Sequence, residues 1–143
     1  MKKILTTIFV AMAMLICVAC STTNKPETRP TTYQTVSWAT IRQEGQDNIA
    51  RTTEKYVGKY YSFSGELFYI ANDASYITIN EINPGKMTSS VFCKVIDQED
   101  RQTILNAKAD DLVIIKGKIT DIEYDSWSKT VKIDMDLYEI QIQ

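Results

Sequence analysis

Histidine is absent from this chain of 143 residues, which also holds only three cysteines and three prolines. The lack of histidine removes the commonest general base at neutral pH and the commonest metal ligand. The sequence also contains no glycine-rich phosphate loop, no zinc-ligand spacing and no Ser/His/Asp arrangement. We therefore expect no enzymatic activity, no metal and no cofactor.

The small number of cysteines limits the possible disulfides and reactive thiols. Cys17 and Cys20 lie in or next to the N-terminal apolar run, which leaves Cys93 without a partner for an intramolecular disulfide. Cys93 stands in the alternating stretch VFCKV, and no histidine is present to activate its thiol. We predict that Cys93 is a small buried hydrophobe on a strand.

The first twenty residues have the layout of a secretion signal. Lys2 and Lys3 precede an uncharged apolar run that begins at Ile4 and ends at Ala19. A positive start, an apolar middle and a small residue before the cleavage point are typical of signal peptides. The run is shorter than the ~20 residues that span a bilayer, which argues against a transmembrane helix. We predict a signal peptide over residues 1–19.

Cys20 follows Val18 and Ala19 and resembles the lipobox cysteine of bacterial lipoproteins, which becomes the acylated first residue of the mature chain. One position departs from that motif, because Cys17 stands where leucine is usual. The resemblance implies lipidation of Cys20, with palmitate or a similar acyl chain, and a cell-envelope location on a membrane. It does not distinguish the periplasmic side from the surface. The alternative is a freely secreted chain cleaved after Ala19.

Residues 20–37 are rich in threonine and proline and poor in large apolar groups, which predicts a flexible tether before a folded domain over residues 38–143.

The leader holds two lysines and no acid, so the mature chain has 14 basic and 18 acidic residues, a net charge of −4. Nucleic-acid-binding domains are normally basic. The charge therefore argues against nucleic acid as a partner.

The domain should begin with an amphipathic helix over residues 38–56. Trp38, Ile41 and Tyr56 belong to an apolar set that recurs at steps of three or four residues. Ser37 is a suitable N-cap and Gly58 a suitable stop. Gly45 lies inside this helix, which indicates either close packing or a boundary between two shorter helices.

Five stretches with strand-like alternation follow the helix, with expected bounds of 59–70, 76–80, 91–96, 112–124 and 130–142. A short helical pattern around Ile104 and Leu105 separates the third stretch from the fourth. Acidic residues stand at its start, where the helix dipole favours them. The tip between the fourth and fifth stretches reads DSWSK.

The first and fourth stretches share a glycine and a slip in their alternation. In the first stretch, Gly65 occupies one of the alternating apolar positions, and Ile70 then falls on the opposite parity. In the fourth stretch, Gly117 occupies an apolar position and Ile122 falls on the opposite parity. A strand that bends sharply in a small barrel needs a residue without Cβ, and often an extra residue that resets the alternation. The pattern predicts a mainly β fold with flanking helices, a five-stranded Greek-key OB-fold barrel preceded by an N-terminal helix.

These stretches resemble the tRNA-anticodon-binding-like family of bacterial OB-fold lipoproteins. The resemblance lies in YVGKYYSFSGELFYI, VFCKV, DDLVIIKGKITDI and VKIDMDLYEI, and it covers roughly residues 38–142. It implies the fold, and it suggests nucleic-acid binding through the family's name alone, since a fold does not determine a function.

The usual ligand surface of an OB-fold is the outer face of strands two and three, flanked by the loops between strands one and two and between strands four and five. The predicted ligand face comprises Tyr76, Thr78, Phe92, Lys94 and, at the hairpin tip, Trp127, with Asn72 and Asp73 in the other loop. Aromatic rings beside a lysine suit stacking on bases or sugars. The alternative is that Phe92 and Tyr76 pack under the N-terminal helix or against each other.

Paired acids on the last two strands raise the question of a catalytic or calcium site. Asp134 and Asp136 share one strand face, and Asp121 and Glu123 are expected on the neighbouring strand. Four lysines should balance them: Lys116, Lys118, Lys129 and Lys132. We predict a solvated face and no catalytic or calcium site.

The whole pattern predicts a lipid-anchored binding module of the cell envelope that binds a protein partner, with an oligonucleotide- or glycan-binding domain as the alternative.

Overall fold

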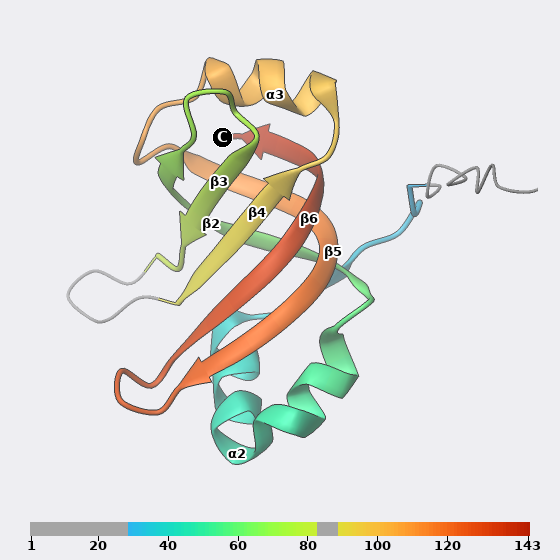
Figure 1. Ribbon diagram of the computed structural model, residues 1–143, viewed down its shortest axis with the longest axis vertical. Coiled ribbons are helices and arrows are strands. Elements are labelled where there is room, and N and C mark those ends of the chain that lie inside the picture. Colours follow the sequence, from blue (N-terminus) through green and yellow to red (C-terminus); the bar gives the residue numbers. More distant parts are fainter. Residues whose placement is uncertain (1–28, 83–88) are drawn as a thin grey trace, which may run out of the picture.

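The computed structural model describes residues 29–82 and 89–143, so the predicted signal peptide and Cys20 lie outside the described residues. Within these described residues, two helices and six strands follow one another (Figure 1). Their bounds are β1 Gln34–Thr35, α2 Trp38–Tyr56, β2 Tyr60–Ile70, β3 Tyr76–Asn80, β4 Ser90–Val95, α3 Gln98–Leu105, β5 Leu112–Asp125 and β6 Thr130–Ile142. No helix among these residues is long and apolar enough to cross a membrane.

Five of the strands close into a barrel. The hydrogen-bonded order is β2, β3, β4, β6, β5, and β5 pairs again with β2. The β4–β6 pair is parallel, whereas the other four barrel pairs are antiparallel. This order, with α2 before the barrel and α3 between β4 and β5, is the Greek-key topology of the OB-fold. The predicted fold class is confirmed.

The predicted slips in alternation are irregularities of the strand register. In β2 the register shifts between Leu67 and Tyr69, and the extra residue Phe68 points outward with 65% of its surface exposed. In β5 a second shift skips Thr120, after which Ile122 returns to the core. These extra residues let a long strand bend and serve two sides of the barrel.

The core fills the barrel with the in-phase residues of every strand. Cys93 is fully buried there, as predicted. Helix α2 packs against β5 and β6, while α3 packs against β6 and β4 at the opposite end (Figure 1). The largest fully buried side chains include Phe63, Ile41, Leu67, Ile77, Ile79, Ile115, Ile133 and Leu137.

Helix α2 begins and ends where its sequence predicts. The Ser37 side chain accepts a hydrogen bond from the Thr40 N–H, and Gly58, with φ of +81°, follows the last turn. Gly45 packs closely against β5, since a Cβ there would lie 3.5 Å from the Tyr124 ring. The interruption of the helix falls three residues later, at Asn48, which is non-helical and whose side chain accepts from the Arg51 N–H.

Part of the predicted tether contacts the barrel, which we did not expect. Gln34 and Thr35 form the two-residue strand β1, parallel to β2. Val36 packs against the core, and the Trp38 indole Nε1 donates to the Ser64 carbonyl oxygen at 2.9 Å. These contacts cover the half of β2 that β3 does not pair with. An uncovered strand edge is a site for unwanted pairing, so the segment protects the barrel.

Candidate functional site

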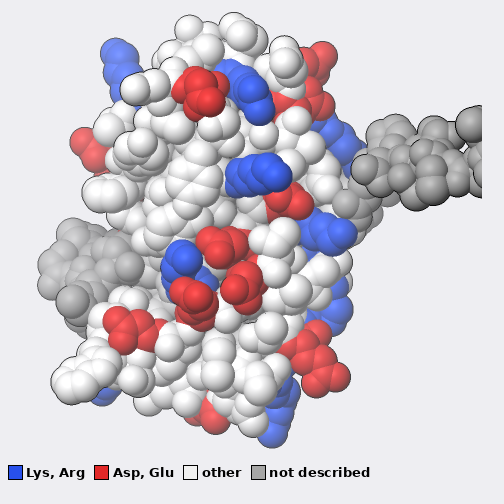
Figure 2. Space-filling model, viewed as in Figure 1, with Lys and Arg blue, Asp and Glu red and all other residues white. Residues whose placement is uncertain are grey.

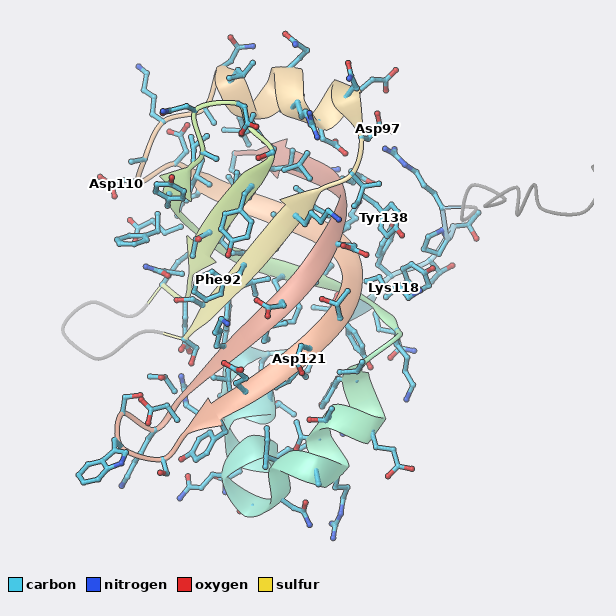
Figure 3. All side chains as sticks on the ribbon, viewed as in Figure 1. Phe92, Asp97, Asp110, Lys118, Asp121 and Tyr138 are labelled. Carbon is cyan, nitrogen blue, oxygen red and sulfur yellow. The ribbon has the colours of Figure 1, made fainter. Side chains whose placement is uncertain are left out.

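The outward side chains of β3, β4, β6 and β5 form three rows, which we call the outer face. The strand register places Tyr76, Lys94, Asp136 and Lys118 in the first row; Thr78, Phe92, Asp134 and Asp121 in the second; and Asn80, Ser90, Lys132 and Glu123 in the third. Figure 3 shows Phe92 on β4 and Asp121 on β5 of this face. The barrel thus brings four of the five predicted ligand residues onto one surface.

Aromatic and basic groups stack at the centre of the outer face. The Tyr76 and Phe92 rings lie 6.2 Å apart, and the Lys132 Nζ lies 5.0 Å from the centre of the Phe92 ring. Both rings are half-buried, and burial raises the pKa of the Tyr76 phenol. Phe92 and Tyr76 therefore pack against each other rather than under α2. Thr78 lies in the same face but is only 5% exposed, so it offers little surface to a ligand.

Three charged side chains of the outer face pair with one another. Lys132 Nζ lies 3.5 Å from a Glu123 carboxylate oxygen and 3.7 Å from one of Asp134. Figure 2 shows acidic and basic side chains interspersed over this side of the molecule. The described residues include no group of three or more acids or cysteines that could hold a metal ion. Glu123, Lys132 and Asp134 therefore form an ion-paired cluster at the surface of this face.

A groove of about 470 Å³ lies between β4 and the β5–β6 hairpin. Its floor and walls combine the Phe92 and Tyr124 rings with polar and charged groups. The lining residues are Ser90, Phe92, Glu123, Tyr124, Asp125, Thr130, Val131 and Lys132. Sequence reasoning identified only Phe92 of this set as a ligand residue. The sequence did offer one signal for the other lining residues. Most of them fall between residues 123 and 132, in or next to the predicted hairpin tip.

Trp127 stands at the tip of the β5–β6 hairpin with 96% of its surface exposed. Asp125 holds the tip in shape, since its two carboxylate oxygens accept from the Trp127 N–H at 2.9 Å and the Ser128 hydroxyl at 2.7 Å. These hydrogen bonds lower the pKa of Asp125, that from Ser128 most strongly. Lys129 completes the turn with φ of +57°. The indole is therefore presented on a hydrogen-bonded turn.

The second loop expected to flank the site lies near α3, away from the groove (Figure 1). Asn72 and Asp73 are exposed there, and Asp73 accepts from both the N–H and the hydroxyl of Ser75. Neither residue lines the groove. Lys94 lies in the row nearest to this loop and is also exposed. The structure thus places Phe92 in the groove, Trp127 at the tip of the hairpin outside the groove lining, and Asn72 and Asp73 in a separate loop.

The thiol of Cys93 should not react in the folded protein. Its side chain is fully buried, and burial raises the pKa of the thiol well above its usual range. With iodoacetamide at pH 8, we expect no alkylation of Cys93 under native conditions and complete alkylation in urea, measured by peptide mass spectrometry. Equal rates of alkylation in the two conditions would contradict the buried position.

No family model matches this chain, and no curated protein matches it. Its structure is similar to that of the mitochondrial single-stranded DNA-binding protein Rim1 from S. cerevisiae, with 11% identity over 58% of this chain and 92% of Rim1, and a TM-score of 0.45. An OBody bound to hen egg-white lysozyme matches with 18% identity over 65% of this chain and 89% of the OBody, also at 0.45. An aspartyl tRNA synthetase from Entamoeba histolytica matches with 10% identity over 81% of this chain but 23% of the synthetase, at 0.49. At these identities the likeness concerns the fold alone.

One expectation from the sequence needs correction. The net charge argued against nucleic acid as a partner, yet Rim1, a single-stranded DNA-binding protein by name, is among the structures with which the chain shares its fold. The physical reason is that net charge averages over the whole surface, whereas a ligand meets only the face that binds it. The net charge of −4 therefore does not make nucleic acid an unlikely partner.

Proposed function

We propose that this protein is a binding module, anchored to a membrane of the cell envelope through an acylated Cys20, that holds a protein partner at the β5–β6 hairpin. The observation that carries the proposal is the nearly fully exposed Trp127 at the tip of the hairpin, whose residues Asp125 and Thr130 line a groove of about 470 Å³. The chemistry of that groove suits binding, and we infer no catalysis. Membership of the tRNA-anticodon-binding-like lipoprotein family is part of the same proposal.

Three properties of the hairpin favour a protein partner. Tryptophan is enriched among the residues that dominate protein–protein binding energy, and each such anchor contributes roughly 2 kcal/mol or more. The turn around Trp127 is held by Asp125, which reduces the entropy lost on binding. The mixed charges beside the groove, such as Glu123 and Lys132, suit the polar rim of an interface.

Oligonucleotide or glycan binding is the second candidate, favoured by one specific arrangement. Lys132 sits over the Phe92 ring, and Tyr76 lies on the ring's other flank. A base or sugar could stack beside these rings while the lysine meets a phosphate, and each stacked base contributes ~1 to 3 kcal/mol. Such binding should weaken steeply as salt rises, whereas an apolar protein contact should not.

The hairpin is tested by photo-crosslinking in cells, with a photoreactive amino acid at Ser126 beside Trp127. We expect one crosslinked protein adduct that is lost in Trp127→Ala. Tyr69→Ala is the matched control, because Tyr69 is an exposed aromatic residue of β2, outside the groove. Oligonucleotide titrations by fluorescence anisotropy at low and physiological salt run in parallel. Submicromolar, salt-sensitive binding that needs Phe92 and Lys132, with no protein adduct, would favour the second candidate.

The lipid anchor is tested separately by the Cys20→Ala substitution. We expect the wild-type chain to incorporate a clickable fatty-acid analogue and to fractionate with membranes, and the variant to lose both properties. Several acyl chains give stable anchoring because each buried methylene contributes ~0.8 kcal/mol. Cys17→Ala is the control and should keep the label. Unchanged labelling and fractionation of Cys20→Ala would refute the anchor.

A further inference from the structure

The segment over residues 29–37, which we call the strap, is attached to the barrel by several kinds of contact. Arg29 forms an ion pair with Asp97, the N-cap of α3, and lies 3.5 Å from a carboxylate oxygen of Asp100 in the first turn of that helix. The Tyr33 ring meets the Tyr60 ring edge-on at a centroid distance of 6.3 Å. The strap therefore begins at the α3 end of the barrel.

The rest of the strap continues this attachment along β2. Lys116 Nζ lies 5.9 Å from the centre of the Tyr33 ring and also pairs with Glu139 at 2.7 Å. The Gln34–Thr35 strand and the packing of Val36 then carry the chain to α2. Each contact is individually weak, but they are spread along the whole strap and hold it jointly.

The hairpin that carries Trp127 lies at the other end of the barrel. Strand β6 begins at Thr130 beside the hairpin tip and reaches Glu139, next to the strap, nine residues later. At ~3.3 Å per residue this is roughly 30 Å along the strand. Figure 1 shows α3 and the β5–β6 hairpin at opposite ends, and Figure 3 labels Asp97 at the α3 end.

We propose that the docked strap orients the domain on the membrane, with the α3 end near the bilayer and the Trp127 hairpin directed away from it. This inference rests on the proposed acylation of Cys20. Arg29 is nine residues after Cys20, so the anchor lies at most about 30 Å from the α3 end. If the strap were free, the anchor would be attached to Trp38 through eighteen residue steps that reach about 60 Å, and no end of the barrel would be favoured.

This orientation determines which kind of partner Trp127 can meet. Tryptophan side chains are frequent both in protein interfaces and at the membrane–water interface. In this orientation the hairpin is the end of the domain farthest from the bilayer, and contact between Trp127 and the lipid would require the domain to tip onto its side or to invert. In this orientation the exposed indole of Trp127 is accessible to a protein in the aqueous compartment and is held away from the lipid surface.

Energy transfer to a lipid acceptor tests the orientation in the full acylated chain on vesicles of phosphatidylethanolamine and phosphatidylglycerol. A donor dye is placed at Gln102→Cys on α3 or at Ser126→Cys on the hairpin, both exposed positions. Cys93 is buried and Cys20 is blocked by its acyl group, so only the new thiol is labelled. We expect higher transfer efficiency from residue 102 than from residue 126.

The strap is then released by Arg29→Ala combined with Tyr33→Ala, and we expect the difference between the two dye positions to disappear. Thr31→Ala with Thr32→Ala is the matched control, since both threonines are exposed members of the strap. Equal transfer from the two positions in the wild-type chain, or a blue shift of the tryptophan emission on vesicles that Trp127→Ala abolishes, would overturn the orientation while leaving the anchor intact. A chain that does not float with the vesicles refutes the anchor, and the orientation with it.

Discussion

Replacing Gly117 with valine is expected to destabilise the domain by at least about 3 kcal/mol, the upper end of the usual cost of overpacking. A Cβ at this position would lie 2.3 Å from the Asp136 carbonyl oxygen and 2.6 Å from Cγ of Met135. Both are far inside van der Waals contact. The first obstacle is the backbone of β6 itself, so no side-chain rotation can relieve it.

The neighbourhood of Gly117 makes this clash hard to relax. Asp136 lies in the middle of β6, with β4 paired on one side and β5 on the other. Moving its carbonyl would disturb two ladders of the barrel at once. Urea denaturation followed by circular dichroism measures the effect. Natural domains are stable by only about 5 to 15 kcal/mol, so a large share of the total stability should be lost.

Two substitutions provide controls for Gly117→Val. Thr120→Val places the same branched valine side chain at an exposed residue of the same strand that is skipped in the β5–β6 register, and it should change stability by less than about 0.5 kcal/mol. Gly45→Ala adds a Cβ that meets its neighbours at 3.5 Å, an ordinary contact, and removes a glycine from a helix. A Gly117→Val domain as stable as these two would contradict the barrel packing.

The strands could be predicted because each has a buried face with a clear period of two. β3 and β6 have the predicted bounds of 76–80 and 130–142, and β4 begins and ends one residue earlier than predicted. The register irregularities before Ile70 and Ile122 could be predicted because a single extra residue moves every later side chain to the other face of the strand. Local pattern and global fold agree in these elements.

The strap and the groove could not be predicted, since their contacts join residues distant in sequence. Arg29 meets Asp97, and β1 is only two residues long, too short to show any alternation. The groove depends on how the hairpin lies beside β4, which brings Glu123 and Lys132 near Phe92. The contacts of Tyr33 and Val36 with the barrel could not be predicted from the composition of residues 20–37, because two isolated apolar side chains do not make a periodic pattern.

Replacing Gly65 with valine is expected to destabilise the domain by about 2 to 3 kcal/mol, less than the same change at Gly117. A Cβ there would lie 2.5 Å from the Asn80 carbonyl oxygen and 3.1 Å from Cδ1 of Ile79. The obstacle is again backbone, but Asn80 is the last residue of β3. The end of a strand can shift with the loss of fewer ladder bonds than its middle, and the Ile79 side chain can rotate.

The ranking of the two glycines tests the origin of the effect as well as its size. If close approach of backbone is the cause, Gly65→Ala should retain much of the cost of Gly65→Val, because the first carbon of either side chain already meets the Asn80 oxygen. If the cause were only the branched shape of valine, alanine would be tolerated. Thermal unfolding of both variants separates the two causes, and Ser64→Val is the control, since that exposed neighbour in β2 faces away from the barrel interior.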